Sequence, residues 1–203
     1  MFALFGGIPL TLLLTGAPRW AMHVALWCCV AYAARWLSRQ TGFSWRRVWH
    51  GDGWPRRERR WAVARFLLAA PLLVALVLWI APERFLSFPR ERTGLWLVVM
   101  ALYPLLSALP QELVFRSFFT ARYAALLPRP AMMIGVNAFW FGFAHIMFLN
   151  ALAPLLCVIG SVMFSLSYRR HRALKWVALE HAAYGCLLFT LGLGRYFFAG
   201  NPP

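Results

Sequence analysis

The chain has 203 residues, of which 62% are hydrophobic and only 13% are charged, and it includes 17 Phe and 11 Trp. A soluble domain of this size could not bury that much apolar surface in one core, so the composition indicates an integral membrane protein. The net charge of +15 would suggest nucleic-acid binding in a soluble chain. Here the arginines cluster between apolar runs, as charge that flanks a membrane does. We therefore expect the lipid bilayer as a partner and no nucleic acid.

The first apolar stretch, residues 1–15, lacks the basic residues that open a secretory signal, because the first positive residue is Arg19. We interpret it as a retained short span. After a break at Pro18, residues 20–36 return across the bilayer, and the strongly basic segment 35–65 follows. The positive-inside rule places this segment, and with it the N-terminus, on the cytoplasmic side.

The middle of the chain contains a further span at 61–80, a short outer loop of mixed charge at 81–93 and an apolar run at 94–127. This last run carries Pro104 and Pro110. It could form one long, proline-kinked helix, or a span that ends at Pro110 and is followed by a second helix. Its length matches one tilted or kinked crossing better than two short pieces, so we predict a single helix.

Three more spans are predicted at 131–149, 151–168 and 176–198, followed by an outer tail at 200–203. Counting crossings gives seven, and all the strongly basic loops then lie on one side of the membrane. The predicted fold class is all-α, a polytopic membrane helix bundle of about seven transmembrane helices that forms a single integral domain over 1–203. We expect a multi-pass protein of a bacterial inner (plasma) membrane with a cytoplasmic N-terminus.

Few ionisable residues lie away from the ends of these spans, namely Glu112, Arg116, His145, Glu180 and His181. Isolated charges at membrane depth are costly, so they usually mark a functional site or a buried structural pair. Glu112 and Arg116 are four residues apart with the acid first, the favourable order for a pair on one helix face. A rise of about 1.5 Å per residue puts the acid and both imidazoles about 9 to 24 Å below the nearest basic loop.

A carboxylate and two imidazoles that converge from three helices form a chemically meaningful set. The carboxylate can take a proton from water, and an imidazole can hold that water or donate to an oxyanion. Glu112, His145 and His181 could also bind a zinc ion and leave one position open for water. The structural alternatives are a Glu112–Arg116 pair that only fixes helix register, and histidines that only pack, with Asn137 as the partner of His145.

Three motifs occur in order on the fourth, fifth and seventh predicted helices: Gln111-Glu112-Leu-Val-Phe-Arg116, Phe141-Gly-Phe-Ala-His145 and Glu180-His181-Ala-Ala-Tyr-Gly185. Together they resemble the CPBP family, the type II CAAX prenyl endopeptidases and bacteriocin-processing intramembrane proteases, whose pattern is Glu-Glu-x-x-x-Arg, Phe-x-x-x-His and His-x-x-x-Asn. The resemblance defines a family-like catalytic core of about 94–198. It implies a conical cavity open to the cytoplasm, in which a Glu with a His activates water and the second His with Asn stabilises the oxyanion.

Two positions depart from this pattern, because the first Glu is Gln111 and the Asn position is Gly185. Glutamine cannot act as a base at neutral pH, so the role of the base would fall to Glu112 or Glu180. The combination is compatible with a variant active site and with an inactive one. Neither H-E-x-x-H nor G-x-S-x-G is present, which removes the commonest zinc-protease and serine-hydrolase signatures.

The leading hypothesis is an intramembrane endopeptidase that cleaves near the membrane-anchored end of a protein or peptide substrate. It assigns Glu112 as the general base, Arg116 as the residue that orients it, and His145 and His181 as holding the water and the oxyanion. A glutamate-type mechanism requires no cofactor, whereas a metal-dependent one would place Zn on His145, His181 and Glu112.

Two alternatives come from other classes of protein. The first is a catalytically inactive relative that acts as an immunity, sorting or scaffold protein, and Gln111 together with Gly185 motivates it. The second is a small transporter whose buried charges relay protons, although the sequence shows no inverted repeat. No oligomeric state follows from the sequence.

Overall fold

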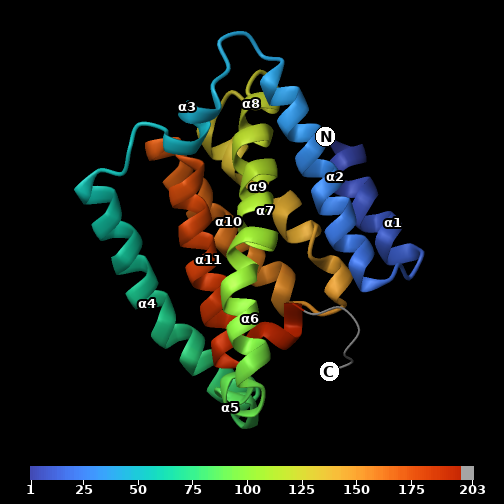
Figure 1. Cartoon of the computed structure of the whole chain (residues 1–203), viewed down its shortest axis with the longest axis vertical. Helices are drawn as coiled ribbons and strands as arrows, with labels where there is room; N and C mark the ends of the chain where they lie inside the picture. The colour runs from blue at the N-terminus through green and yellow to red at the C-terminus, as the bar shows by residue number, and fades with distance from the viewer. Residues whose placement is uncertain (198–203) are drawn as a thin grey trace.

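The computed structural model describes residues 1–197 and is 83% helical, with no strand in that range. The all-α prediction is therefore confirmed (Figure 1). Phe198, the predicted end of the last span, and the predicted tail 200–203 lie outside the described residues. The α-helices are α1 (Ile8–Leu14), α2 (Arg19–Ser38), α3 (Trp45–His50), α4 (Arg56–Ile80), α5 (Ser87–Glu91), α6 (Thr93–Tyr103), α7 (Leu109–Glu112), α8 (Phe119–Tyr123), α9 (Pro130–Phe143), α10 (Leu152–His171) and α11 (Leu174–Leu191). Short 3₁₀ and π segments adjoin them, namely η1 (Ala3–Gly7), η2 (Pro82–Arg84), η3 (Pro104–Ala108), η4 (Leu113–Phe118), η5 (Ile146–Phe148) and η6 (Leu193–Phe197).

Four helical segments are long and apolar enough to cross a membrane, and each coincides with a predicted span. They are Arg56–Ile80, Thr93–Tyr123, Pro130–Phe148 and Leu152–His171. Large apolar side chains on their outer faces are exposed, as Leu67, Leu68 and Trp79 of α4 are. Burying apolar surface stabilises by about 25 cal/mol per Å², and hydrocarbon supplies that environment here.

The predicted count of seven spans is not confirmed, because only these four of the predicted spans are long and apolar enough to cross a membrane in the described residues. The first apolar helical stretch runs from Ala3 to Leu14, whereas a crossing helix needs about 20 residues. Helices α2 and α11 lie where spans were predicted, but neither is among the four. In α11 the polar residues Lys175, Glu180 and His181 lower the mean hydropathy of the helix.

The run predicted as one proline-kinked helix is continuous from Thr93 to Tyr123, so it ends four residues before the predicted boundary at Leu127. Two π-helical stretches interrupt the α-helix, η3 directly at Pro104 and η4 directly after Glu112. Proline cannot donate a backbone hydrogen bond, and a wider π turn is one way in which a helix accommodates such a break. The kink therefore lies beside the candidate acid.

Helix α11 occupies the middle of the bundle and packs against α4, α6, α7 and η3. Helices α9 and α10 pack closely along each other, and Gly142 permits this approach because a Cβ there would overlap the side chain of Val158. Figure 1 shows α4 at one edge of the bundle and α2 toward the opposite edge, with the continuous helix α6–α8 between them. This arrangement brings the three motif-bearing helical regions together.

The core around η4 is built mainly from aromatic side chains. Phe118, Phe119 and Phe141 are almost completely buried, and the rings of Phe115 and Phe141 meet edge to face at 4.9 Å. In a membrane such rings stabilise the fold through close van der Waals packing, because lipid is as apolar as the core. Arg116 is 1% exposed within the same core, so its charge must be satisfied by protein groups.

Candidate active site

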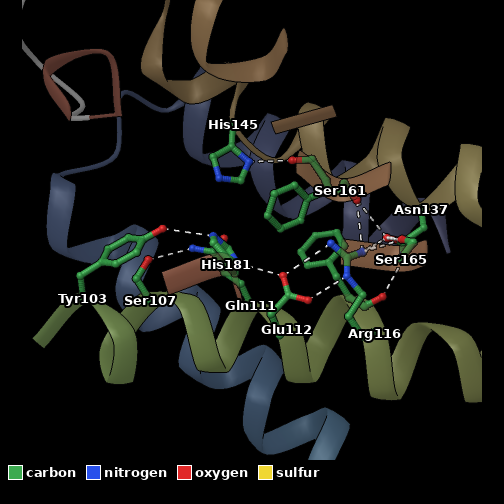
Figure 2. Close-up of polar contacts among 12 residues, drawn as sticks. Tyr103, Ser107, Gln111, Glu112, Arg116, Asn137, His145, Ser161, Ser165 and His181 are labelled. Carbon is green, nitrogen blue, oxygen red and sulfur yellow. Dashed lines mark hydrogen bonds and ion pairs between the residues drawn. The ribbon is translucent and has the colours of Figure 1, made fainter. Parts of the chain in front are cut away.

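The Glu112–Arg116 pair expected from its spacing forms where α7 passes into η4. Arg116 Nε donates to Glu112 Oε2 at 2.8 Å, and Arg116 Nη2 lies 3.5 Å from Glu112 Oε1 (Figure 2). The side chains are 0% and 1% exposed. Removing one partner of such a buried pair costs about 3–5 kcal/mol, because the remaining charge loses its compensation.

Hydroxyl and amide groups from α9 and α10 satisfy the rest of the guanidinium. Arg116 Nη1 donates to Asn137 Oδ1, to Ser161 Oγ at 3.1 Å and to Ser165 Oγ at 3.2 Å. Ser161 and Ser165 are four residues apart and therefore lie on one face of α10. The arginine thus fixes the helix that carries Glu112 against both α9 and α10.

Asn137 belongs to this arginine network and not to His145. Its Nδ2 donates to the carbonyl oxygen of Phe115 at 2.6 Å, while its Oδ1 accepts from Arg116. The expectation that Asn137 is the partner of His145 is therefore wrong. The backbone supplies that partner, because His145 Nδ1 lies 2.6 Å from the carbonyl oxygen of Phe141.

On its other side Glu112 holds His181, which reaches it from α11. Glu112 Oε1 lies 2.8 Å from His181 Nδ1. A carboxylate can only accept, so Nδ1 carries the hydrogen and Nε2 keeps its lone pair in the neutral imidazole. The Tyr103 hydroxyl lies 3.1 Å from this Nε2 and donates to it. The ring of Phe164 stacks on the imidazole at 4.8 Å, which fixes its orientation.

Gly185 makes room for this tyrosine. It lies one helical turn after His181, and a Cβ at this position would overlap the ring of Tyr103. Any larger residue at 185 would displace the ring. The position at which the family pattern has Asn is therefore adjacent to a tyrosine hydroxyl in this protein.

His145 lies between α9 and η5, and its ring packs near those of Phe141 and Phe148. The Phe141 carbonyl can only accept, so His145 Nδ1 donates to it and Nε2 remains an acceptor. The ring of Phe141 lies 4.9 Å from the His145 ring and 5.8 Å from the His181 ring, measured between centroids. Both imidazoles thus pack near one phenyl ring.

A cavity of about 760 Å³ lies between the helices, and most of its lining is apolar. Polar side chains of the site that line it are Tyr103, Ser107, Gln111, His145 and His181. The structure therefore brings both predicted histidines to one cavity. Glu112 is 0% exposed and is not part of the lining, so it reaches the cavity only through His181.

Gln111 lines the cavity where the family pattern has its first glutamate. Its Nε2 donates to Ser107 Oγ at 2.8 Å. Its Oε1 is buried without a hydrogen-bond partner among residues 1–197. Buried polar atoms nearly always have a partner, which is often ordered water. A water molecule or a substrate group in the cavity would supply one here.

Glu180 lies on a different face of α11 from its neighbour His181. It accepts from Arg65 Nη2 at 2.8 Å, and the same nitrogen of Arg65 donates to Ser167 Oγ at 2.7 Å. Glu180 does not line the cavity. This interaction ties α4 to α10 and α11, which is a structural role.

The donor set does not fit a three-ligand zinc site. Glu112 uses its oxygens on Arg116 and His181, and His181 Nε2 accepts from Tyr103. Across residues 1–197 no group of three or more His, Cys, Asp or Glu side chains is arranged to hold a metal ion.

Sequence reasoning missed four polar residues of the site, Tyr103, Ser107, Ser161 and Ser165. Ser161 and Ser165 had a signal, since they are four residues apart in an apolar helix and face one side of it. No comparable spacing marked Tyr103, which is a single tyrosine followed by a proline in an apolar run. Only the fold shows that its hydroxyl reaches a histidine 78 residues further along the chain.

Comparison with protein families gives a match over residues 93–187, just under half of the chain, to the family described as type II CAAX prenyl endopeptidase Rce1-like. The matched region includes all three motifs. No curated protein and no solved structure matches the chain.

Proposed function

Since residues 93–187 place this chain in the CPBP family, we propose that it is an intramembrane endopeptidase that hydrolyses a peptide bond near the membrane-anchored end of a protein substrate. The observation that carries the proposal is the shared cavity. Two imidazoles, those of His145 and His181, line it together with Gln111. The buried carboxylate of Glu112 is hydrogen-bonded to His181.

His181 is the general base in this proposal, because its Nδ1 donates to the carboxylate of Glu112. When Nε2 takes a proton, the carboxylate balances the charge of the imidazolium, and a hydrogen bond to a charged group is about twice as strong as a neutral one. His145 Nδ1 donates to a neutral carbonyl instead, so His145 is the weaker base.

Glu112, predicted as the direct base, acts in this proposal through His181. Its side chain has no exposed surface and does not line the cavity. Serine hydrolases use the same arrangement, in which the histidine is the base and a buried carboxylate orients it and fixes its tautomer. Arg116 holds the carboxylate of Glu112 in place through its hydrogen bond, which is the orienting role predicted for it from the sequence.

His145 and Gln111 hold the reactants. His145 Nε2 accepts a hydrogen bond from the attacking water. The Gln111 amide has a second N–H beside the one given to Ser107, and it donates to the oxygen of the scissile carbonyl. One donor of this kind is worth about 10²- to 10³-fold in rate.

The reaction proceeds in two balanced steps. The water oxygen bonds to the carbonyl carbon while one water proton passes to the His181 side, and the carbonyl π electrons move to the oxygen. The carbon–nitrogen bond then breaks, the carbonyl reforms, and the proton returns to the leaving amine. The apolar wall of the cavity suits a substrate that brings an apolar chain with it.

Purified protein reconstituted in proteoliposomes tests the proposal. A quenched fluorogenic peptide with a farnesylated cysteine near its C-terminus should be cleaved, and His181→Ala and His145→Ala should each reduce kcat/KM by about 10²-fold or more. His171→Ala is the matched control. His171 is also buried, its Nδ1 accepts from the backbone N–H of Ala173, and it does not line the cavity. Equal cleavage by all three variants contradicts the proposal.

A second candidate function is a catalytically inactive relative that binds membrane partners as an immunity, sorting or scaffold protein. The observation in its favour is Gln111, which brings an amide to the cavity where the family pattern has a carboxylate. The variant Gln111→Glu separates the two functions. An amide that serves as an oxyanion donor is replaced by a repelling charge, so turnover should fall at least 10-fold. Absence of turnover in the wild-type protein together with unchanged partner binding by the variant would favour the inactive relative.

We further propose a location in a bacterial inner membrane, with seven crossings and a cytoplasmic N-terminus. The apolar helices and the family support a membrane protein. The clustering of arginine in 35–65 and 169–172 supports this orientation. Reporter fusions after residues 52, 88 and 172 test it. The first and third should report the cytoplasm and the second the opposite side.

A further inference from the structure

Tyr103 lines the cavity next to His181. It is the last residue of α6, and Figure 2 shows its side chain beside that of His181. Its hydroxyl donates to His181 Nε2 at 3.1 Å. An imidazole nitrogen has one in-plane lone pair, so this hydrogen bond occupies the atom that would take a proton from water. While this hydrogen bond is in place, the lone pair of Nε2 is not available to a water molecule in the cavity.

The position of the hydroxyl is fixed from several sides. The ring of Tyr103 packs edge to face on Phe189 at 5.4 Å and lies 6.1 Å from the His181 ring. The absence of a side chain at Gly185 leaves the space that the ring occupies. The adjoining π segment η3 begins at Pro104. This segment and the space at Gly185 together position the Tyr103 hydroxyl at Nε2 of His181.

We propose that Tyr103 is a catalytic residue that relays the proton of the attacking water to His181. The hydroxyl accepts a hydrogen bond from water while it donates to Nε2, as a phenol can. As the water oxygen bonds to the carbonyl carbon, the water proton moves to the Tyr103 oxygen and the phenolic proton moves to Nε2. The tyrosine is neutral before and after, and Glu112 balances the new charge on His181.

The return of the proton follows the same path in reverse. The imidazolium gives its Nε2 proton back to the Tyr103 oxygen, and the phenolic proton passes to the nitrogen of the leaving amine as the carbon–nitrogen bond breaks. No oxidant, reductant or metal takes part. This inference rests on the proposed peptidase function and adds to it the residue that contacts the water.

Tyr103→Phe tests the relay, with Tyr168→Phe as the matched control. Tyr168 is buried whereas Tyr103 is half-buried, and the Tyr168 hydroxyl likewise donates to a side chain, Ser117 Oγ at 3.2 Å, but Tyr168 does not line the cavity. With the farnesylated fluorogenic peptide in proteoliposomes, Tyr103→Phe should lower kcat about 10²-fold with KM nearly unchanged. Tyr168→Phe should leave kcat within about 2-fold, because the lost hydroxyl lies outside the reaction path.

A proton inventory in mixtures of H₂O and D₂O supplies a readout that a structural role would not move. A relay transfers two protons in one step, so kcat of the wild-type protein should curve downward against the deuterium fraction. In Tyr103→Phe the water can reach Nε2 directly, and the residual rate should depend linearly on that fraction. A linear inventory in the wild-type protein overturns the relay.

Gly185→Ala provides a second variant that retains the hydroxyl but displaces it. Its added Cβ overlaps the ring of Tyr103, so kcat should fall as in Tyr103→Phe. Gly135→Ala, also within a helix but with open space around the added methyl group, should retain activity. If the wild-type protein cleaves the peptide and Tyr103→Phe matches it, the relay is wrong and the peptidase function stands. If neither the wild-type protein nor Gln111→Glu cleaves the peptide, both fall.

Discussion

Glu112 Oε1 lies 2.8 Å from His181 Nδ1, a contact between residues 69 positions apart that joins the kinked helix α6–α8 to α11. The same carboxylate is held from the other side by Arg116. The buried carboxylate of Glu112 therefore accepts hydrogen bonds from two side chains. The guanidinium of Arg116 is always charged, whereas the imidazole of His181 is charged only when it takes a proton. Because the two partners differ in this way, substitutions can separate the contribution of the Glu112–His181 contact to catalysis from that of the Glu112–Arg116 pair to stability.

Glu112→Gln should abolish most turnover per folded molecule, and it should also lower stability by about 3–5 kcal/mol because Arg116 loses its buried counter-charge. The amide can donate to His181 Nδ1, which favours the tautomer with hydrogen on Nε2 and leaves the imidazolium without a balancing charge. The equivalent change in a serine protease triad costs about 10⁴-fold in kcat, so we expect a loss of at least about 10²-fold with KM little changed. Steady-state kinetics on the farnesylated peptide measure this. A variant with more than half of the wild-type kcat would contradict the role of Glu112.

Arg116→Met should mainly lower the stability of the fold. The substitution leaves Glu112 buried without its ion pair and removes the partner of Asn137, Ser161 and Ser165. Leaving one buried charge unpaired costs about 3–5 kcal/mol. The unfolding temperature in detergent should therefore fall sharply. Arg84→Met is the control, since Arg84 is half-exposed, lies 3.5 Å from Glu83 and should contribute about 0–1 kcal/mol.

Glu180→Gln separates the two acids that the sequence left open as bases. Glu180 accepts from Arg65 and lies outside the cavity lining. We expect lower thermal stability but a kcat per folded molecule within about 3-fold of the wild-type value, since no proton-transfer contribution of 10²-fold or more is removed. A loss of turnover equal to that of Glu112→Gln, at unchanged stability, would instead assign Glu180 to the reaction.

Metal removal should leave activity unchanged, because the donors that a zinc ion would need are engaged with one another. Dialysis against 1,10-phenanthroline, followed by elemental analysis of the protein and assay of the peptide, checks this. Loss of turnover that added zinc restores would show that the hydrogen bonds among Glu112, His181 and Tyr103 rearrange around an ion.

Spacing alone predicted the ion pair, because Glu112 and Arg116 are related by local helical geometry that does not depend on the rest of the fold. The single kinked helix also followed from its length and its two prolines. The convergence of His145 and His181 could be expected only coarsely, from depth below the basic loops, and from the family motifs.

The function of each acid could not be read from the sequence. Neighbouring positions on a helix point about 100° apart, so Gln111 and Glu112 face different surroundings, and so do Glu180 and His181. Which of them faces the cavity depends on the π turn and on how α11 is rotated, and both are set by packing far from the motif. The partner of Asn137 was mispredicted for the same reason, since four-residue spacing to Phe141 gave no information on η4 and α10, which supply its partners.

The largely apolar lining of the cavity has a practical consequence for work with the isolated protein. The cavity includes leucines from opposite edges of the bundle, Leu26 of α2 and Leu72 of α4, and hydrocarbon surrounds the sides of a protein in a bilayer. When no substrate is bound, acyl tails of lipid or alkyl tails of detergent can occupy its apolar part, beside water at the polar groups. Apparent substrate affinity will therefore depend on the chain length of the surrounding amphiphile, and inhibitors that carry a long aliphatic tail should compete with it directly.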